Sequence, residues 1–169
     1  MEPVSERARV VPPTPAKVLE IAQERMRGAV PDADLSAFAV VFTLIRAAER
    51  MTYELETVQR PQGWTWPGFR VLFWIWLLGP LEPRAIATLA SASRASISSA
   101  LNTLERNGFV ARSRSSSDRR LVTVELTELG SARIAAAFDA TNKREQELVA
   151  SLSADERRTI TALLARLLV

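Results

Sequence analysis

The sequence predicts a mainly helical fold with one small β-hairpin, an α+β class, on three observations. Apolar residues recur at three- and four-residue steps through most of the 169-residue chain, as on the buried face of an amphipathic helix. Two short segments, FVARS and LVTVEL, are rich in β-branched residues and flank the polar run RSSSDRR, which predicts two strands and a loop. Residues that favour helix starts stand where most of the predicted helices begin.

The first half of the chain is predicted to hold three helices. Residues 1–15 combine both charge signs with four prolines, so we expect a disordered tail, and 16–31 form a short N-terminal helix. An apolar stripe from Leu35 to Leu55 predicts a long helix within 32–62. The segment TWPGFRVLFWIWLLG begins with the N-cap candidate Thr65 and is apolar nearly all round, so we expect it to be buried between two layers.

The second half is predicted to hold two short helices, the hairpin and two further helices. LEPRAIATLA and SRASISSALNTLERNG are separated by a turn around Ser91, and Ser93 is the N-cap candidate of the second. Thr127 is predicted to cap a helix that runs to about Leu152. Ser153 and Glu156 have the spacing of a capping box that opens the last helix.

Composition argues against an enzyme and against a membrane protein. The chain has no cysteine and no histidine, which removes the thiolate nucleophile, the usual general base and the commonest metal ligands. We therefore predict no catalytic residue, no metal and no cofactor. The N-terminus does not have the pattern of a signal peptide, and the longest apolar run is far shorter than the ~20 residues of a membrane span, so we expect a cytoplasmic protein.

Positive charge is concentrated in one segment. Six arginines and two acidic residues lie between Arg94 and Arg120, a net charge of +4, whereas the whole chain carries +3. Such a local excess is typical of an element that binds a polyanion.

A pair of short helices followed by a hairpin is the layout of a winged helix-turn-helix, whose second helix enters the major groove of double-stranded DNA. The predicted recognition helix is 93–107, and the predicted wing is 109–126. We expect Arg94 to contact guanine and Asn102 to read adenine, while Asp118 orients a wing arginine that enters the minor groove or binds phosphate. The candidate DNA-binding residues are Arg94, Ala95, Ser96, Ser98, Ser99, Asn102 and Thr103 on the helix, and Arg112, Arg114, Asp118, Arg119 and Arg120 on the wing.

The segment SRASISSALNTLERNGFVARSRSSSDRRLVTVELTELG resembles the core of MarR family regulators, and the Asp118-Arg119-Arg120 wing followed by LTELG is its most specific part. The resemblance implies a homodimeric transcription regulator, more often a repressor, on a pseudo-palindromic operator. It places Arg120 in the minor groove and Arg119 toward phosphate. It also implies a winged helix-turn-helix at 64–126 and a helical dimerisation region formed by 32–62 plus 127–169.

The same resemblance implies a small aromatic or anionic effector that releases the DNA. The candidate ligand-binding residues are Trp64, Trp66, Arg70 and Trp74. The tryptophans permit two interpretations, walls of a ligand pocket or ordinary core packing, and the second is favoured. Family recognition helices often carry a basic residue where this chain has Ser99 and Thr103, so the wing arginines are expected to supply most of the phosphate contact.

A second class of function remains open at this point. A winged helix can bind another protein without specific DNA binding. The local charge of +4 and the paired arginines argue against that alternative.

Overall fold

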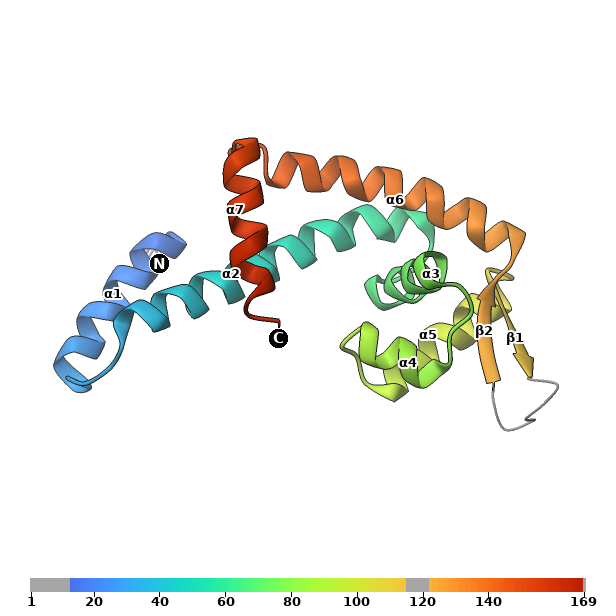
Figure 1. Ribbon diagram of the computed structural model, residues 1–169, viewed down its shortest axis with the longest axis horizontal. Coiled ribbons are helices and arrows are strands. Elements are labelled where there is room, and N and C mark those ends of the chain that lie inside the picture. The colour runs from blue at the N-terminus through green and yellow to red at the C-terminus, as the bar shows by residue number, and fades with distance from the viewer. Residues whose placement is uncertain (1–12, 115–121, 169) are drawn as a thin grey trace, which may run out of the picture. The chain divides into compact units, whose positions relative to one another are not determined.

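The computed structural model describes residues 13–114 and 122–168 of the chain. The fold divides into two compact units, Met1–Arg50 and Met51–Val169, and helix α2 crosses from the first into the second. The first unit holds α1 (Pro15–Ala29) and the first part of α2 (Leu35–Gln59). The second holds the end of α2 and the elements η1 (Arg60–Gln62), α3 (Trp66–Leu78), α4 (Pro83–Leu89), α5 (Arg94–Arg106), β1 (Val110–Arg114), β2 (Val122–Leu126), α6 (Glu128–Leu148) and α7 (Ala154–Ala165) (Figure 1).

Both helices of the first unit begin at a capping side chain. Thr14 accepts a hydrogen bond from the backbone of Lys17, so α1 starts one residue earlier than the predicted helix. Asp34 Oδ1 accepts from the backbone nitrogens of Ala37 and Ser36 at 3.0 and 2.9 Å. These hydrogen bonds and one from the Ser36 hydroxyl lower the pKa of the Asp34 carboxyl, because they stabilise its charged form.

The core of the second unit is built around α3, which contacts α4, α5, α6 and β2. Val71, Leu72 and Ile75 of α3 are fully or almost fully buried. Besides Trp64 and Phe69, the core contains large apolar side chains from the neighbouring elements: Ile86, Ile97, Leu101, Leu104, Val110, Val124 and Ile134. The prediction that this apolar helix is buried between two layers is wrong for the last turn of α3. Trp76, Leu77 and Leu78 are 40–56% exposed, because in this single chain the turn extends beyond the elements that cover the rest of α3.

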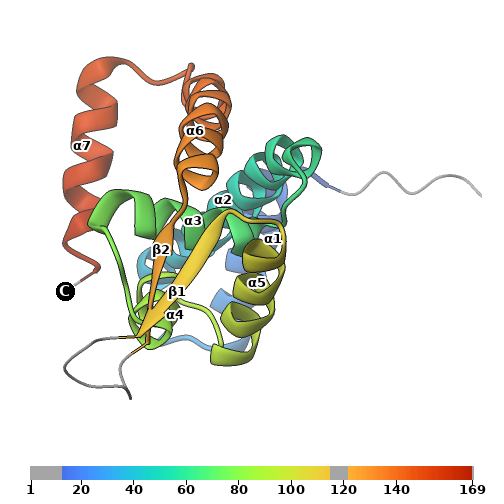
Figure 2. The ribbon, with the colours of Figure 1, turned by 90° about the vertical axis from the view of Figure 1, so that its right-hand side faces the viewer.

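The hairpin is antiparallel, and it carries an additional bridge that the sequence does not predict. Val110 pairs with Leu126 and Arg114 with Val122. Leu81, in the α3–α4 connection, bridges to the other edge of β2, with hydrogen bonds of 2.8 and 3.0 Å to Val124. Figure 2 shows the hairpin beside α5 in the same lobe. The base of the wing is therefore attached to the core on both sides of β2.

A glycine allows α6 to start against the base of the wing. Thr127 caps α6 by accepting from the backbone of Gly130, and its hydroxyl donates to the carbonyl of Gly108 at 2.6 Å. A β-carbon at Gly130 would lie 1.9 Å from the carbonyl oxygen of Phe109. The glycine of the LTELG segment is thus required by close packing of two backbones.

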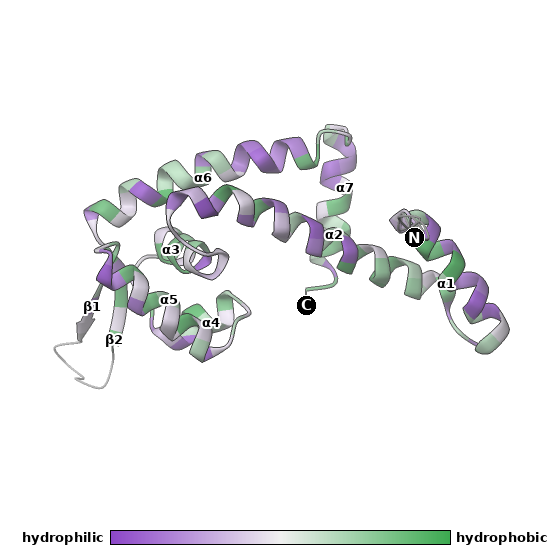
Figure 3. Cartoon of the chain, turned by 180° about the vertical axis from the view of Figure 1, so that it is seen from behind, coloured by the Kyte–Doolittle hydropathy of each residue, from purple (hydrophilic) through white to green (hydrophobic). Residues whose placement is uncertain are grey.

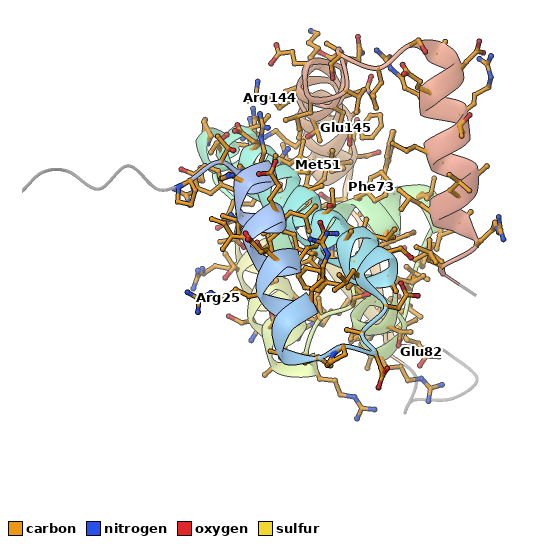
Figure 4. All side chains as sticks on the ribbon, turned by 90° about the vertical axis from the view of Figure 1, so that its left-hand side faces the viewer. Arg25, Met51, Phe73, Glu82, Arg144 and Glu145 are labelled. Carbon is orange, nitrogen blue, oxygen red and sulfur yellow. The ribbon has the colours of Figure 1, made fainter. Side chains whose placement is uncertain are left out.

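The end of α2 is fastened to α6 by polar contacts. Arg144, labelled in Figure 4, pairs with Glu54 at 2.6 Å. Nearby, Gln59 donates its amide to Thr141, and Trp64 donates its indole N–H to the oxygen of Gln59 at 2.7 Å. Gln59, Thr141 and Trp64 are all buried, so these hydrogen bonds satisfy polar groups that water does not reach.

Helix α6 ends at Leu148, four residues before the predicted end, and Val149 to Leu152 form a turn. The capping box of Ser153 and Glu156 is present and opens α7 as predicted. No residue of α7 is buried, and Figure 3 shows the helix hydrophilic at its start and hydrophobic toward its end. In the parts of the chain that the structure describes, none of the helices has the length and apolarity needed to cross a membrane.

Candidate nucleic-acid interface

Helix α5 presents one polar face because its other face is fixed in the core. Ser93 caps the helix by accepting from the backbone of Ser96 at 3.1 Å. Ile97, Leu101 and Leu104 are each about 1–2% exposed and recur at three- and four-residue steps. The predicted contact residues that lie exposed on the remaining surface are Arg94, Ala95, Ser98, Ser99, Asn102 and Thr103, and Ser96 is half-buried.

Helix α4 precedes α5 and packs against it. The connecting turn contains Ser91 with φ of 44°, a left-handed conformation that a non-glycine residue rarely adopts. With the antiparallel hairpin directly after α5, the arrangement is that of a winged helix-turn-helix.

A groove beside α5 gathers three arginines. Arg84, Arg94 and Arg112 line a hollow of about 580 Å³ together with Ser98. Arg84 stands in the first turn of α4, where it pairs with Glu82 at 2.7 Å, and it is not among the residues that the sequence singles out. A basic residue at the start of the first helix of the motif is the signal that could have identified it. Such a groove suits a phosphate backbone that passes along α5.

The guanidinium of Arg112 is tied to α5. Its Nη2 donates to Asn102 Oδ1 at 2.8 Å, and its Nη1 lies 3.5 Å from Glu105 Oε2. The sequence predicts Arg112 and Asn102 as separate contacts to DNA, one on the wing and the other a reader of adenine on the helix. The structure instead brings these two side chains together on the flank of α5.

The other wing residues are placed only in part. Arg114 is the last residue of β1, and it pairs in register with Val122. Asp118, Arg119 and Arg120 lie outside the described residues. Their predicted contacts with DNA therefore stay predictions.

The candidate ligand-binding residues separate into two places. Trp66, Arg70 and Trp74 line one pocket of about 190 Å³ between α3 and α6. Trp64 is not among its lining residues: it is buried, and its ring packs edge-on against Phe109 with 5.3 Å between centroids. Of the two interpretations of the tryptophans, ordinary core packing is the one that fits Trp64.

The pocket between α3 and α6 has aromatic walls and one arginine. Its other lining residues, which the sequence does not single out, are Phe69, Phe73, Phe138, Thr141 and Glu145, and Figure 4 labels Phe73 and Glu145. Phe73 and Phe138 stack with their ring centroids 5.9 Å apart. Arg70 is half-buried, and this burial lowers the pKa of its guanidinium, which still remains charged. The step of four residues from Trp66 to Arg70 to Trp74 was the available signal for a shared face.

No metal centre is found among the residues that the structure describes: no three His, Cys, Asp or Glu side chains come together there. The geometry instead defines a DNA-binding protein of the winged helix-turn-helix class.

Comparison with known proteins identifies the family. The MarR family profile matches residues 64–122. The chain is 35% identical over 134 residues to YwaE, an uncharacterised HTH-type transcriptional regulator of Bacillus subtilis. The aligned residues cover 79% of this chain and 78% of YwaE. The chain therefore belongs to the MarR family, and it is a DNA-binding transcription regulator rather than an enzyme.

Solved structures share the fold. A mutant of Escherichia coli MarR complexed with operator DNA is 23% identical, with a TM-score of 0.70 over 85% of this chain and 98% of that one. BpsR of Bordetella bronchiseptica, whose DNA binding is regulated by 6-hydroxynicotinic acid, is 23% identical, with a TM-score of 0.69 over 76% of this chain and 98% of that one. The predicted fold class, a mainly helical winged helix-turn-helix with a two-stranded wing, is confirmed.

Proposed function

We propose that the protein is a homodimeric repressor that binds a pseudo-palindromic operator, with α5 in the major groove of each half-site and the hairpin against the adjacent backbone or minor groove. The observation that carries the proposal is the exposed face of α5, which combines Arg94 with small hydroxyl and amide side chains. Short side chains let the helix approach base edges closely, and each of these types can hydrogen-bond to bases or phosphates.

The arginine-lined groove supports the second part of the contact. Arg84 of α4 and Arg94 at the start of α5 line this groove together with hairpin residues, and a DNA strand leaving the major groove would pass there. The E. coli MarR fold, which this chain shares, occurs in complex with operator DNA. Residues 64–126 are proposed to serve as the DNA-binding region, and this likeness of fold supports the proposal.

The partner in the proposed dimer is a second copy of this chain. Residues 32–62 and 127–169 are proposed to form the dimerisation region. Ile160, Leu163 and Leu164 of α7 are 46%, 51% and 38% exposed, although they repeat at the spacing of a buried helical face. A helix of 12 residues is marginal in water without packing, so α7 needs a surface to cover its apolar side. A dimer bound across two half-sites would block a promoter sterically.

The pocket between α3 and α6 is proposed to bind a small aromatic effector with an anionic group. Its aromatic walls suit a flat ring, and the Arg70 guanidinium suits a carboxylate. BpsR offers a parallel, since 6-hydroxynicotinic acid is an aromatic acid that regulates its DNA binding.

The proposal is tested by selecting bound fragments from a genomic DNA library and footprinting them, together with a mass measurement in solution. We expect a two-fold symmetric site with half-sites about 10 base pairs apart and a mass of about twice 18.7 kDa. Arg94→Ala and Arg120→Ala should each reduce the slope of log affinity against log salt by about 0.9 per subunit.

Lys17→Ala is the matched control, because it removes the same charge from an ion pair on α1, outside the proposed DNA-binding and dimerisation regions. It should leave the slope unchanged. A stable monomer would contradict the dimer. Selection of no DNA site would contradict the repressor and would favour a winged helix that binds another protein.

A further inference from the structure

The bridge from Arg112 to α5 joins the wing to the face proposed to read DNA. Arg112 stands opposite Val124 in the register of the hairpin, and Val124 is fully buried. The backbone of Arg112 is therefore held by a core residue. Asn102 and Glu105 are three positions apart on α5, so both side chains lie on the flank that faces β1. The Arg112 guanidinium thus contacts Asn102 and Glu105 from a backbone position that is held in place.

The chemistry of this bridge fixes the orientation of the Asn102 amide. A guanidinium has only N–H donors, so the amide atom that it meets at 2.8 Å must be the oxygen and not the nitrogen. With its oxygen directed at β1, the amide turns its NH₂ group elsewhere. Asn102 is exposed, so this NH₂ group is available to a ligand of α5.

An amide held in this way reads DNA differently from a free one. A free asparagine contacts adenine with both atoms: its oxygen accepts from N6 and its nitrogen donates to N7. An amide that presents only a donor matches acceptors on the major-groove edge, which are N7 and O6 of guanine, N7 of adenine and O4 of thymine. Cytosine offers a donor there, its N4 amino group, and is mismatched.

We propose that Arg112 is a positioning residue that holds the Asn102 amide as a hydrogen-bond donor. At one position of each half-site, the amide then disfavours cytosine and does not distinguish adenine from guanine. The proposal rests on the proposed function, since it requires α5 in the major groove.

The charges at the bridge agree with a positioning role. Glu105 places a carboxylate on the helix that is proposed to face phosphates, which by itself would weaken DNA binding. Its pairing with Arg112 at 3.5 Å offsets that charge, so the pair as a whole carries no net charge toward phosphate. Arg112 should therefore contribute less to the salt dependence of binding than Arg94 does.

The experiment compares the base preferences of the full chain and its variants by selection from an operator library that is randomised one position at a time. For the wild type we expect cytosine to be disfavoured about tenfold against guanine at the position opposite Asn102. Arg112→Met keeps an unbranched side chain and frees the amide. It should shift that one position toward adenine by about tenfold and leave the other positions unchanged.

Two further variants keep the test independent of a folding defect in Arg112→Met. Asn102→Asp changes an exposed side chain, presents only acceptors, and should shift the same position toward cytosine. Arg106→Met removes an arginine from the last turn of the same helix, outside the bridge, and should leave the preference at that position unchanged.

The outcomes separate the two proposals. Unchanged preferences in Arg112→Met, with a salt slope reduced by about 0.9 per subunit, would show a plain phosphate contact and overturn the positioning role. A preference for adenine already in the wild type would overturn it as well. If the wild type selects no sequence at all, the proposed function itself fails.

Discussion

Replacing Gly130 by alanine should destabilise the junction between α6 and the wing. The added β-carbon would lie 1.9 Å from the carbonyl oxygen of Phe109 and 2.8 Å from its carbon. Both are backbone atoms, so no side-chain rotation can relieve the contact. Since real β-carbons essentially never approach closer than 3.0 Å, the two segments must separate by about 1.1 Å.

The size of the effect follows from the hydrogen bonds that such a shift would break. The backbone nitrogen of Thr127 donates to Phe109 at 3.1 Å, and its hydroxyl donates to Gly108 at 2.6 Å. Each bond contributes about 1 kcal/mol to stability, and strained packing costs about 1–3 kcal/mol. Together these contributions predict a loss of about 3–5 kcal/mol, which for a chain of this length lowers the melting temperature by roughly 6–20 °C.

The assay is thermal unfolding followed by far-ultraviolet circular dichroism at one fixed protein concentration, because dimerisation makes the midpoint depend on concentration. Gly28→Ala is the matched control. A β-carbon at Gly28 would meet nothing within 4 Å, and alanine favours a helix over glycine by about 1 kcal/mol or less near a helix end. That variant should melt at the same temperature or slightly higher. Equal melting temperatures for Gly130→Ala and the wild type would refute the close approach.

Two further predictions concern the aromatic residues. Trp64→Phe removes the buried donor to Gln59 and should reduce the free energy of unfolding, measured in urea, by about 1–3 kcal/mol. Trp76→Phe, at an exposed site, is the control and should change that free energy little. Equal losses in the two variants would contradict the role of the hydrogen bond. If an aromatic carboxylate acts through the pocket between α3 and α6, benzoate should release bound DNA, and Arg70→Gln should raise the required benzoate concentration about tenfold. Release that is equally effective with benzyl alcohol would argue against the arginine contact.

The starts of the helices could be predicted from the sequence because their signals are local. Thr65, Ser93, Thr127 and Ser153 were each expected as an N-cap, and each side chain accepts a hydrogen bond from a backbone nitrogen three residues later. The end of α6 carries no such signal: neither glycine nor proline follows Leu148, and the predicted end was four residues too late. Helix starts are decided by residues that are close in sequence. Correct prediction of the N-caps therefore says little about how well tertiary contacts can be predicted.

The surroundings of the tryptophans depend on residues far away in the chain. Trp64 stands only two positions before Trp66, yet the cap at Thr65 lies between them and only Trp66 belongs to α3. Trp64 is therefore directed by Gln59 and Phe109, while Trp66 shares its pocket with Phe138. Spacing within a helix predicts a shared face. It does not predict which side chains of a distant helix complete that face.

The charge count between Arg94 and Arg120 also leaves out contacts with other parts of the fold. Including them changes which residues are expected to select the sequence and which to bind phosphate. The net +4 between Arg94 and Arg120 counts Arg112 as one cation among six. In the structure its guanidinium is paired with Glu105 and bonded to Asn102, so much of its charge serves a contact within the protein. If Arg112 orients a side chain that reads bases, part of the wing acts on sequence selection. The electrostatic share of binding then falls on the remaining arginines, and the salt slope of the Arg112 variant relative to that of Arg94→Ala measures this division directly.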